Sequence, residues 1–220
     1  MSYATLILGE SGTGKTCSIR NLDPSKTLLI QPVRKPLPFP SKGWKERLGK
    51  NDDGNIFFCE SGAVVKAVLS KLKDYPENPY HVIVIDDWQY ILANEFMDRR
   101  AEKGFQKFVD IGGVGFDVVR LAAELQPNVR VYVLAHTDTS ESGVTKIKTL
   151  GRMLDEKIVI EGLFTTVLKT YVENGKYFFT TQNSGSDTVK SPMGLFSSNL
   201  IENDLNAVDT AICNYYGIEK

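Results

Sequence analysis

Short apolar segments alternate with segments of helical periodicity along the first 135 residues of the chain. Residues 61–74 carry their apolar side chains on one helical stripe, with lysines outside it. Runs rich in β-branched and other apolar residues predict strands buried on both faces at Tyr3–Leu8, Thr27–Gln31, 55–59, 81–86 and 129–135. Alternation of this kind predicts βαβ crossovers, and therefore an α/β fold with a mostly parallel sheet and helices on both faces.

The pattern changes towards the C-terminus. Residues 88–103 and 114–125 predict helices, whereas 163–173 and 176–181 predict antiparallel strands joined by an Asn174-Gly175 turn. Residues 203–216 predict a closing helix that ends near Gly217. We therefore expect one domain over residues 1–220, with a core over 1–162 and a β-hairpin extension and closing helix over 163–220.

Composition narrows the functional class. The 220 residues carry 26 Lys and Arg against 27 Asp and Glu, a net charge of −1, which excludes a uniformly basic nucleic-acid-binding domain. Three cysteines without a CxxC pair and two histidines predict neither a disulfide framework nor a zinc site. Without a long apolar run or a signal peptide, we expect a cytoplasmic protein that makes no membrane contact.

One segment stands apart from this alternation. Residues 32–40 contain four prolines, and residues 34–50 carry six basic side chains against Glu46. Proline fixes φ and lacks an N–H donor, so this segment is expected to be an extended loop outside the sheet. Two interpretations remain open, a solvated surface loop and a contact for a polyanion or a partner.

A phosphate-binding motif follows the first predicted strand directly. The sequence Gly9-Glu10-Ser11-Gly12-Thr13-Gly14-Lys15-Thr16 matches GxxxxGK[ST], with a helix expected from Cys17 onward. Glycines let backbone N–H groups converge on phosphate oxygens, and the residues expected to contact nucleotide run from Gly9 through Cys17. Lys15 is expected to bridge the β- and γ-phosphates, and Thr16 to ligate Mg²⁺. The motif predicts a site for ATP and Mg²⁺.

Acidic and polar residues follow three of the other predicted strands. Asp86 ends an apolar strand and is expected to hold Mg²⁺, whereas Asp87 is either the group that activates water or a helix N-cap. Glu60 is a second candidate base if its strand lies beside the phosphate strand, and otherwise caps the next helix. His136 is either a γ-phosphate sensor or a structural histidine.

With these residues placed, the chain resembles RecA-like P-loop ATPases, and most closely the phage-encoded Sak-type single-strand annealing ATPases. The resemblance is carried by Gly9–Thr16, 82–87, the glycine-rich segment 110–116, the strand ending in His136, and 160–168. It implies that segments 109–116 and 137–151 face DNA, the second through Lys146, Lys148 and Arg152, although a flexible surface loop is the alternative. It also implies that Lys190 is a basic finger for a neighbouring subunit's site, in a homo-oligomer. RecA places a glutamate after its second strand, whereas this chain has Gln31-Pro32-Val33-Arg34 there, so the base comes from elsewhere or hydrolysis is slow.

The expected function is a DNA-stimulated ATPase that pairs or anneals single-stranded DNA in phage recombination, within the host cytoplasm and alongside a phage single-strand binding protein. One alternative is a nucleotide-switched interaction protein that hydrolyses slowly. Another is a small-molecule kinase, for which Arg99-Arg100 would have to form a lid. The aromatic residues Trp44, Trp88 and 177–179 either stack on bases or belong to the core.

Overall fold

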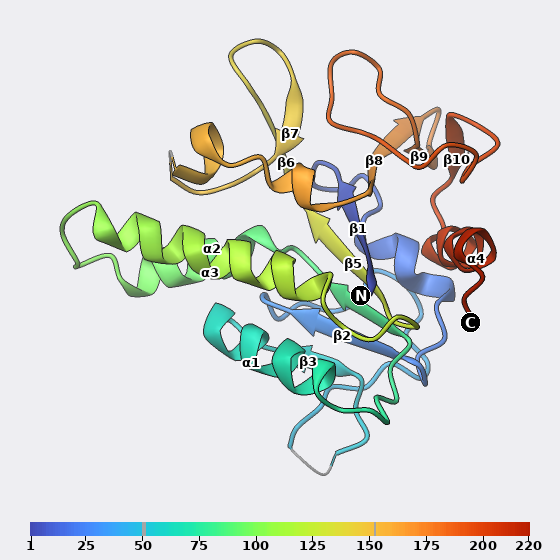
Figure 1. The fold of residues 1–220 in the computed structure, drawn as a ribbon, viewed down its shortest axis with the longest axis horizontal. Helices are drawn as coiled ribbons and strands as arrows, with labels where there is room; N and C mark the ends of the chain where they lie inside the picture. The colour runs from blue at the N-terminus through green and yellow to red at the C-terminus, as the bar shows by residue number, and fades with distance from the viewer. Residues whose placement is uncertain (50–51, 152) are drawn as a thin grey trace.

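The computed structural model describes residues 1–49, 52–151 and 153–220. Its centre is an eight-stranded sheet in the order β10-β9-β8-β1-β5-β4-β2-β3 (Figure 1). Its strands are β1 (Tyr3–Leu8), β2 (Thr27–Gln31), β3 (Ile56–Phe58), β4 (Val82–Ile85), β5 (Arg130–Ala135), β8 (Thr166–Glu173), β9 (Lys176–Thr180) and β10 (Leu200–Glu202). The strands from β8 to β3 are mutually parallel, and β9 pairs antiparallel with both β8 and β10. The predicted α/β class with an antiparallel extension is confirmed.

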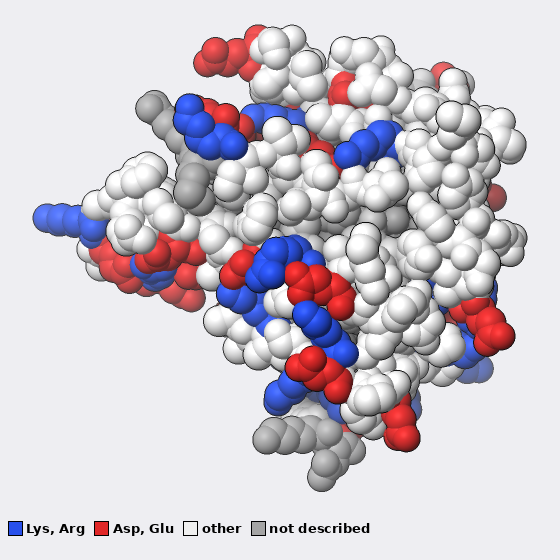
Figure 2. Space-filling model, in the orientation of Figure 1, with Lys and Arg blue, Asp and Glu red and all other residues white. Residues whose placement is uncertain are grey.

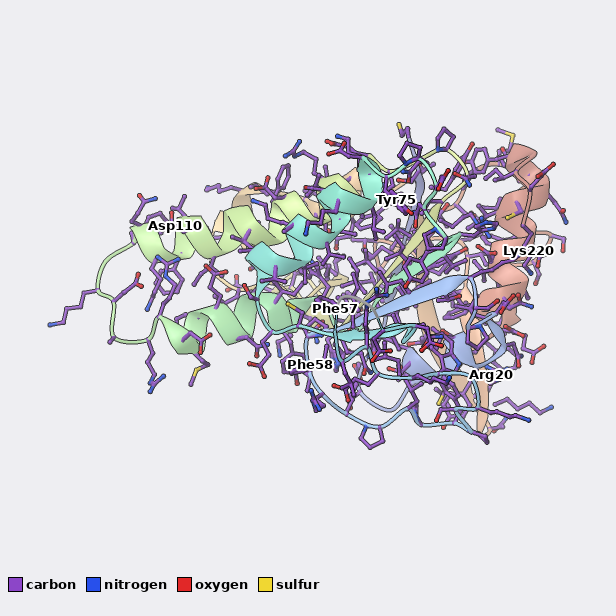
Figure 3. The ribbon with its side chains drawn as sticks, turned by 90° about the horizontal axis from the view of Figure 1, so that it is seen from below. Arg20, Phe57, Phe58, Tyr75, Asp110 and Lys220 are labelled. Carbon is purple, nitrogen blue, oxygen red and sulfur yellow. The ribbon has the colours of Figure 1, made fainter. Side chains whose placement is uncertain are left out.

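Helices cover both faces of this sheet, as buried strands require. The alternation of side chains along β1 sends Leu6 and Leu8 into one core and Ile7 into the other. The first core packs against α1 (Gly62–Lys73), α2 (Gln89–Asp98) and α3 (Gln106–Ala122), and the second against the short 3₁₀ helix η1 (Thr16–Asn21) and α4 (Leu205–Tyr216). In Figure 3 the α2–α3 hairpin and α4 lie at opposite ends of the molecule.

The strand order brings the ends of β1, β4 and β5 to one edge. β5 lies between β1 and β4. Leu8 is level with Ala135, and Ile85 with Val133, so the loops that follow these strands meet. Ligands of open α/β sheets bind at this edge.

The C-terminal extension follows the sequence closely. Asn174 and Gly175 both have positive φ angles, 51° and 72°, as the tight hairpin between β8 and β9 requires. α4 begins after Asp204, whose side chain accepts a hydrogen bond from the Asn206 N–H, and ends at Gly217 in the left-handed conformation. Both predictions for this region are confirmed.

A buried ion pair fastens α4 to the sheet. Asp209 on α4 accepts hydrogen bonds from Arg130 Nε and one terminal guanidinium nitrogen, both at 2.9 Å, and from the Tyr132 hydroxyl at 2.7 Å. All three side chains are nearly inaccessible to solvent. Since an unpaired charge is costly to bury, the three groups hold one another in place.

The glycine-rich segment 110–116 is helical, and its predicted role as part of a DNA-facing loop is wrong. It lies within α3, in contact with α2. A Cβ on Gly115 would lie 2.5 Å from Leu92 Cδ2 and 3.1 Å from the Trp88 ring. Glycine is present here because the helices approach closely. Asp110 lies on the far part of the α2–α3 hairpin from Arg20 (Figure 3).

Within the described residues, no helix is both long and apolar enough to cross a bilayer.

Candidate nucleotide-binding site

The phosphate-binding loop is organised around Lys15. Its side chain is 5% exposed, and its ammonium group donates to the carbonyl oxygens of Gly9 at 2.9 Å and Glu10 at 2.8 Å. Burial lowers the pKa of Lys15, with Asp87 and Asp86 acting in the opposite direction. Gly14 has a φ of 95°, which a residue with a side chain rarely adopts. The loop carbonyls thus hold the Lys15 ammonium group within the loop, and the glycine backbone leaves room for a phosphate to approach.

Thr16 and Asp86 meet beneath this loop. The Thr16 hydroxyl donates to Asp86 Oδ1 at 2.9 Å, across the end of β5. Asp86 is 1% exposed, and burial, followed by the charge of Asp87, raises the pKa of its carboxyl group. A hydroxyl and a carboxylate are hard oxygen ligands, and Mg²⁺ is usually bound by one or two such groups together with substrate phosphates. These residues fit the Mg²⁺ that the P-loop implies.

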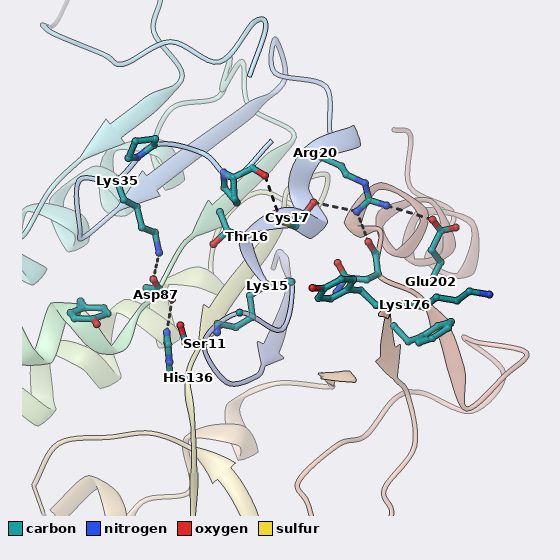
Figure 4. A pocket seen from close by; sticks show the side chains of 18 residues that line it. Ser11, Lys15, Thr16, Cys17, Arg20, Lys35, Asp87, His136, Lys176 and Glu202 are labelled. Atoms are coloured by element: carbon teal, nitrogen blue, oxygen red, sulfur yellow. Dashed lines mark hydrogen bonds and ion pairs between the residues drawn. The ribbon is translucent and has the colours of Figure 1, made fainter. Parts of the chain in front are cut away.

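Asp87 points into the same cavity from a strained backbone. It adopts a φ of 65°, which is uncommon outside glycine, and its side chain contacts the Lys35 ammonium group. His136 Nε2 lies 3.2 Å from its other oxygen (Figure 4). Burial alone would raise the pKa of Asp87, but His136 and Lys35 hold it well below its ordinary value. Asp87 is therefore an ionised hydrogen-bond acceptor.

The helix-capping alternative for Asp87 does not hold. α2 begins at Gln89 after Trp88, and no side chain caps its first turn. The Asp87 carboxylate is directed to Lys35 and His136 instead. The backbone N–H of Trp88 donates to the Leu134 carbonyl on β5, which fixes the chain where it leaves β4.

The far wall of the cavity comes from the antiparallel extension. Tyr177, Phe178 and Asn203 line it opposite the P-loop, and a Cβ on Gly14 would lie 3.0 Å from the Tyr177 ring and 3.2 Å from Asn203 Oδ1. Arg20 on η1 donates to the Asn203 carbonyl at 2.6 Å, joining this wall to the P-loop (Figure 4).

Together these residues enclose a cavity of about 960 Å³, at the upper end of the range for small-molecule sites. In Figure 4, Lys35, Asp87 and His136 lie on one side of Lys15 and Arg20 on the other, where Arg20 is bonded to Asn203. The P-loop lies between these two sides, so a nucleotide with its phosphates on the loop would direct its γ-phosphate to the first side and its nucleoside to the second.

Many solved structures are similar to this chain in fold, and the RadB recombinase is one of them. The crystal structure of the RadB recombinase is similar over 81% of this chain and 79% of that chain, with 15% sequence identity and a TM-score of 0.49. No protein-family model matches the sequence. No curated protein matches it either.

The structure brings most predicted P-loop residues to the cavity. Its lining includes Ser11, Gly12, Gly14, Lys15, Thr16, Cys17, Asp87 and His136. Gly9 and Glu10 supply the carbonyls that bind Lys15, and Thr13 Oγ1 lies 2.6 Å from Thr170 Oγ1 on β8. The predicted helix after the loop is only the 3₁₀ turn η1, because Leu22 is extended and Pro24 follows shortly.

Two predicted residues lie away from this cavity. Glu60 is exposed and follows β3 at the edge of the sheet, with β2, β4 and β5 between that strand and β1. The condition for Glu60 to act as the base is not met, and its role as a candidate base is corrected. Lys190 is exposed, and its backbone pairs with Val167 on β8. Any contact of Lys190 with a phosphate would require another subunit.

The two arginines that the kinase alternative requires as a lid do not line the cavity. Arg99 lies at the end of α2 and pairs with Glu95, Glu102 and Asp110, away from the cavity. Arg100 Nη1 donates to the Met97 carbonyl in the same turn. These contacts give both arginines a local structural role.

The second segment that the sequence predicts to face DNA contains a β-hairpin. β6 (Thr137–Thr139) and β7 (Thr145–Ile147) form a hairpin directly after His136. Lys146 pairs with Asp155 at 2.6 Å, Lys148 is exposed, and Arg152 lies outside the described residues. On the face shown in Figure 2, basic and acidic side chains are interspersed over α1 and α3.

Several lining residues were missed by the sequence analysis. Lys35 was noted only as part of a basic loop, and Asn203 only as a helix start. Strand adjacency could have indicated Lys35, because it follows the strand beside β4. Of the aromatic candidates, Tyr177 and Phe178 line the cavity, whereas Trp44, Trp88 and Phe179 are core residues.

Proposed function

We propose that this chain binds MgATP on its P-loop and hydrolyses it. The observation that carries the proposal is the 2.9 Å hydrogen bond between Thr16 and Asp86 beside the buried ammonium group of Lys15. Those groups come from separate parts of the sequence and converge at the edge where α/β sheets bind ligands. A glycine-rich turn without nucleotide would not need a buried carboxylate and lysine together.

Each of these side chains has a distinct role in the proposed reaction. With ATP bound, Lys15 would exchange its loop carbonyls for β- and γ-phosphate oxygens, and Thr16 and Asp86 would hold Mg²⁺, which would neutralise phosphate charge. Asp87 accepts a hydrogen bond from the attacking water and orients it, with His136 fixing the carboxylate. As the water oxygen bonds to the γ-phosphorus, the bond to the bridging oxygen breaks, a proton of the water passes to an oxygen of the transferred phosphate, and ADP and inorganic phosphate leave.

Asn203 supports adenine as the base. It is 2% exposed, and its Nδ2 has no hydrogen-bond partner within the described part of the chain. A buried amide without a partner is costly, so a ligand that pairs with it gains affinity. An amide offers one donor and one acceptor, which matches the N7 and N6 edge of adenine. Tyr177 and Phe178 add aromatic surface beside it.

We propose further that turnover is coupled to single-stranded DNA, as in annealing or pairing during phage recombination. Support comes from the β6–β7 hairpin, because the backbone N–H of Lys148 donates to the His136 carbonyl at 2.8 Å. A phosphate contact at Lys148 would therefore act next to the γ-phosphate end of the cavity. A homo-oligomer would place Lys190 of one copy near the site of another, and a single-strand binding protein would be the partner on DNA.

The test is ATP turnover with and without single-stranded DNA. Lys15→Ala should abolish turnover and the exposed control Lys71→Ala should not, while Lys148→Ala should reduce the stimulation by DNA and its salt dependence. If Lys15→Ala turns over ATP like the wild type, the site is wrong. If DNA neither stimulates turnover nor binds, only the DNA proposal fails.

A second candidate is a nucleotide switch with slow hydrolysis. The observations that favour it are Gln31 at the end of β2 and the Lys35 contact that engages Asp87. Burst-phase measurements with excess ATP at saturating DNA separate the two candidates. One turnover followed by a stall would favour the switch, and sustained turnover would favour the ATPase.

A further inference from the structure

The proline-rich segment after β2 lies along the nucleotide cavity. Lys35, Pro36 and Pro38 line it, while Leu37 and Phe39 pack against the core beneath. Leu37 and Phe39 therefore anchor the segment on the core, while Lys35 reaches the cavity. Because proline restricts the backbone, a segment of this kind can present Lys35 with a small loss of conformational entropy.

Lys35 faces both carboxylates at the end of β4. Its ammonium group contacts Asp87 Oδ2 and lies 3.8 Å from Asp86 Oδ2, while its side chain remains 36% exposed (Figure 4). The two carboxylates are almost fully buried, and like charges so close require a counter-charge. Lys15 is bonded to loop carbonyls, so in this structure Lys35 supplies the ammonium group in direct contact with Asp87.

Binding of a triphosphate with its cation would change the charges that attract and repel the Lys35 ammonium group. A cation at Thr16 and Asp86 would repel the Lys35 ammonium group, and a γ-phosphate would offer it a more highly charged partner than one carboxylate. Lys35 has a mobile stem of four methylene groups, so it can change partners without a shift of the anchored segment. Asp87 would then be released to accept a hydrogen bond from water.

We propose that Lys35 is a γ-phosphate-binding residue supplied by the same chain, which exchanges Asp87 for the γ-phosphate when a triphosphate binds. This proposal rests on the proposed function, since it requires a nucleotide on the P-loop. It assigns Lys35 two states, counter-ion of Asp87 before binding and ligand of the γ-phosphate afterwards. A diphosphate lacks the group that draws Lys35 away, so Lys35 gives the site a preference for triphosphate.

The neighbouring basic side chains Arg34, Lys42 and Lys45 do not line the cavity. Arg34 pairs with Glu46 at 2.6 Å and lies over the Phe58 ring, and Lys45 lies 3.9 Å from Asp53. Lys42 is exposed and outside the cavity lining, which makes it a matched control on the same loop. Of these side chains, Lys35 is the one that lines the cavity.

The test compares affinity for Mg²⁺ with AMP-PNP and for Mg²⁺ with ADP in the wild type and in Lys35→Met, Lys35→Arg and Lys42→Met. A charged hydrogen bond lost in Lys35→Met should reduce the preference for AMP-PNP over ADP by roughly 10- to 100-fold. Lys35→Arg keeps the charge and should retain most of that preference, and Lys42→Met should match the wild type.

Hydrogen exchange provides a readout that does not depend on turnover. In the wild type, exchange over residues 32–40 and 86–90 should change with AMP-PNP and not with ADP, and Lys35→Met should remove that difference. The proposal is overturned if Lys35→Met keeps the wild-type ratio of affinities. A wild type that binds ADP and AMP-PNP equally well would also overturn it while leaving the nucleotide site intact. A wild type that binds neither would overturn the proposed function as well.

Discussion

Two glycines of α3 give opposite predictions for the same substitution. Nothing lies within 4 Å of a Cβ built on Gly113, so Gly113→Ala should stabilise the helix by about 0.5–1 kcal/mol. At Gly115 the same gain is opposed by contact with Leu92 and Trp88, which are 1% and 0% exposed and cannot move freely. Overpacking of this kind costs about 1–3 kcal/mol. That range is therefore the expected difference in unfolding free energy between the variants.

Urea unfolding followed by circular dichroism measures this difference directly. In a chain of this size it corresponds to roughly 2–12 °C between the two melting temperatures, with Gly113→Ala the higher. Leu92→Ala removes the closest contact, so Gly115→Ala should lose much of its cost in that background. If both glycine variants shift stability equally, segment 110–116 does not pack as a helix against α2.

Three other predictions concern the site and its support. Asp86→Asn should raise the Mg²⁺ concentration needed for half-maximal ATP turnover at least tenfold, because the amide lacks the charge that holds the cation. Unchanged Mg²⁺ titration curves would contradict this. Asn203→Ala should reduce the selectivity for ATP over GTP in competition binding by roughly 10-fold, whereas loss of both nucleotides equally would indicate a structural role. Asp209→Ala should lower the free energy of unfolding in urea by about 3–5 kcal/mol, because it leaves the buried Arg130 charge without its partner. A loss below about 1 kcal/mol would show that the Arg130 guanidinium group reaches solvent in the variant.

The P-loop and its Asp86 partner could be predicted because each is local. Gly9–Thr16 follows a strand and opens a turn, and Asp86 ends an apolar run, so short patterns suffice. The parallel sheet then brings them together, since its strands end at one edge. The β8–β9 hairpin was predictable for the same reason, because Asn174-Gly175 determines its own turn.

The parts that the sequence analysis missed depend on contacts between distant segments. Glycines at 112, 113 and 115 are typical of a loop, and only the approach of α2 explains them as helix packing. Asn203 precedes a helix, and its place opposite Gly14 depends on β9 and β10 folding back over the P-loop. Glu60 was a plausible base until the sheet order placed β3 at the edge. Spacing along the chain contains none of this information.

The residues that follow β2 and β4 bring opposite charges to one end of this site. β2 and β4 are adjacent and parallel, so the residues after them reach the same end of the cavity. Here the carboxylate comes from β4, as Asp87, and the segment after β2 contributes the cation Lys35. A carboxylate after β2 would add a third acid to Asp86 and Asp87 around one γ-phosphate. With Lys35 after β2 instead, an ammonium group balances the charge of these two carboxylates. It follows that introducing a glutamate at position 35 should not restore activity to Asp87→Asn, because the same change removes the proposed γ-phosphate ligand. Recovery of ATP turnover in the double variant Lys35→Glu with Asp87→Asn would refute this division of roles.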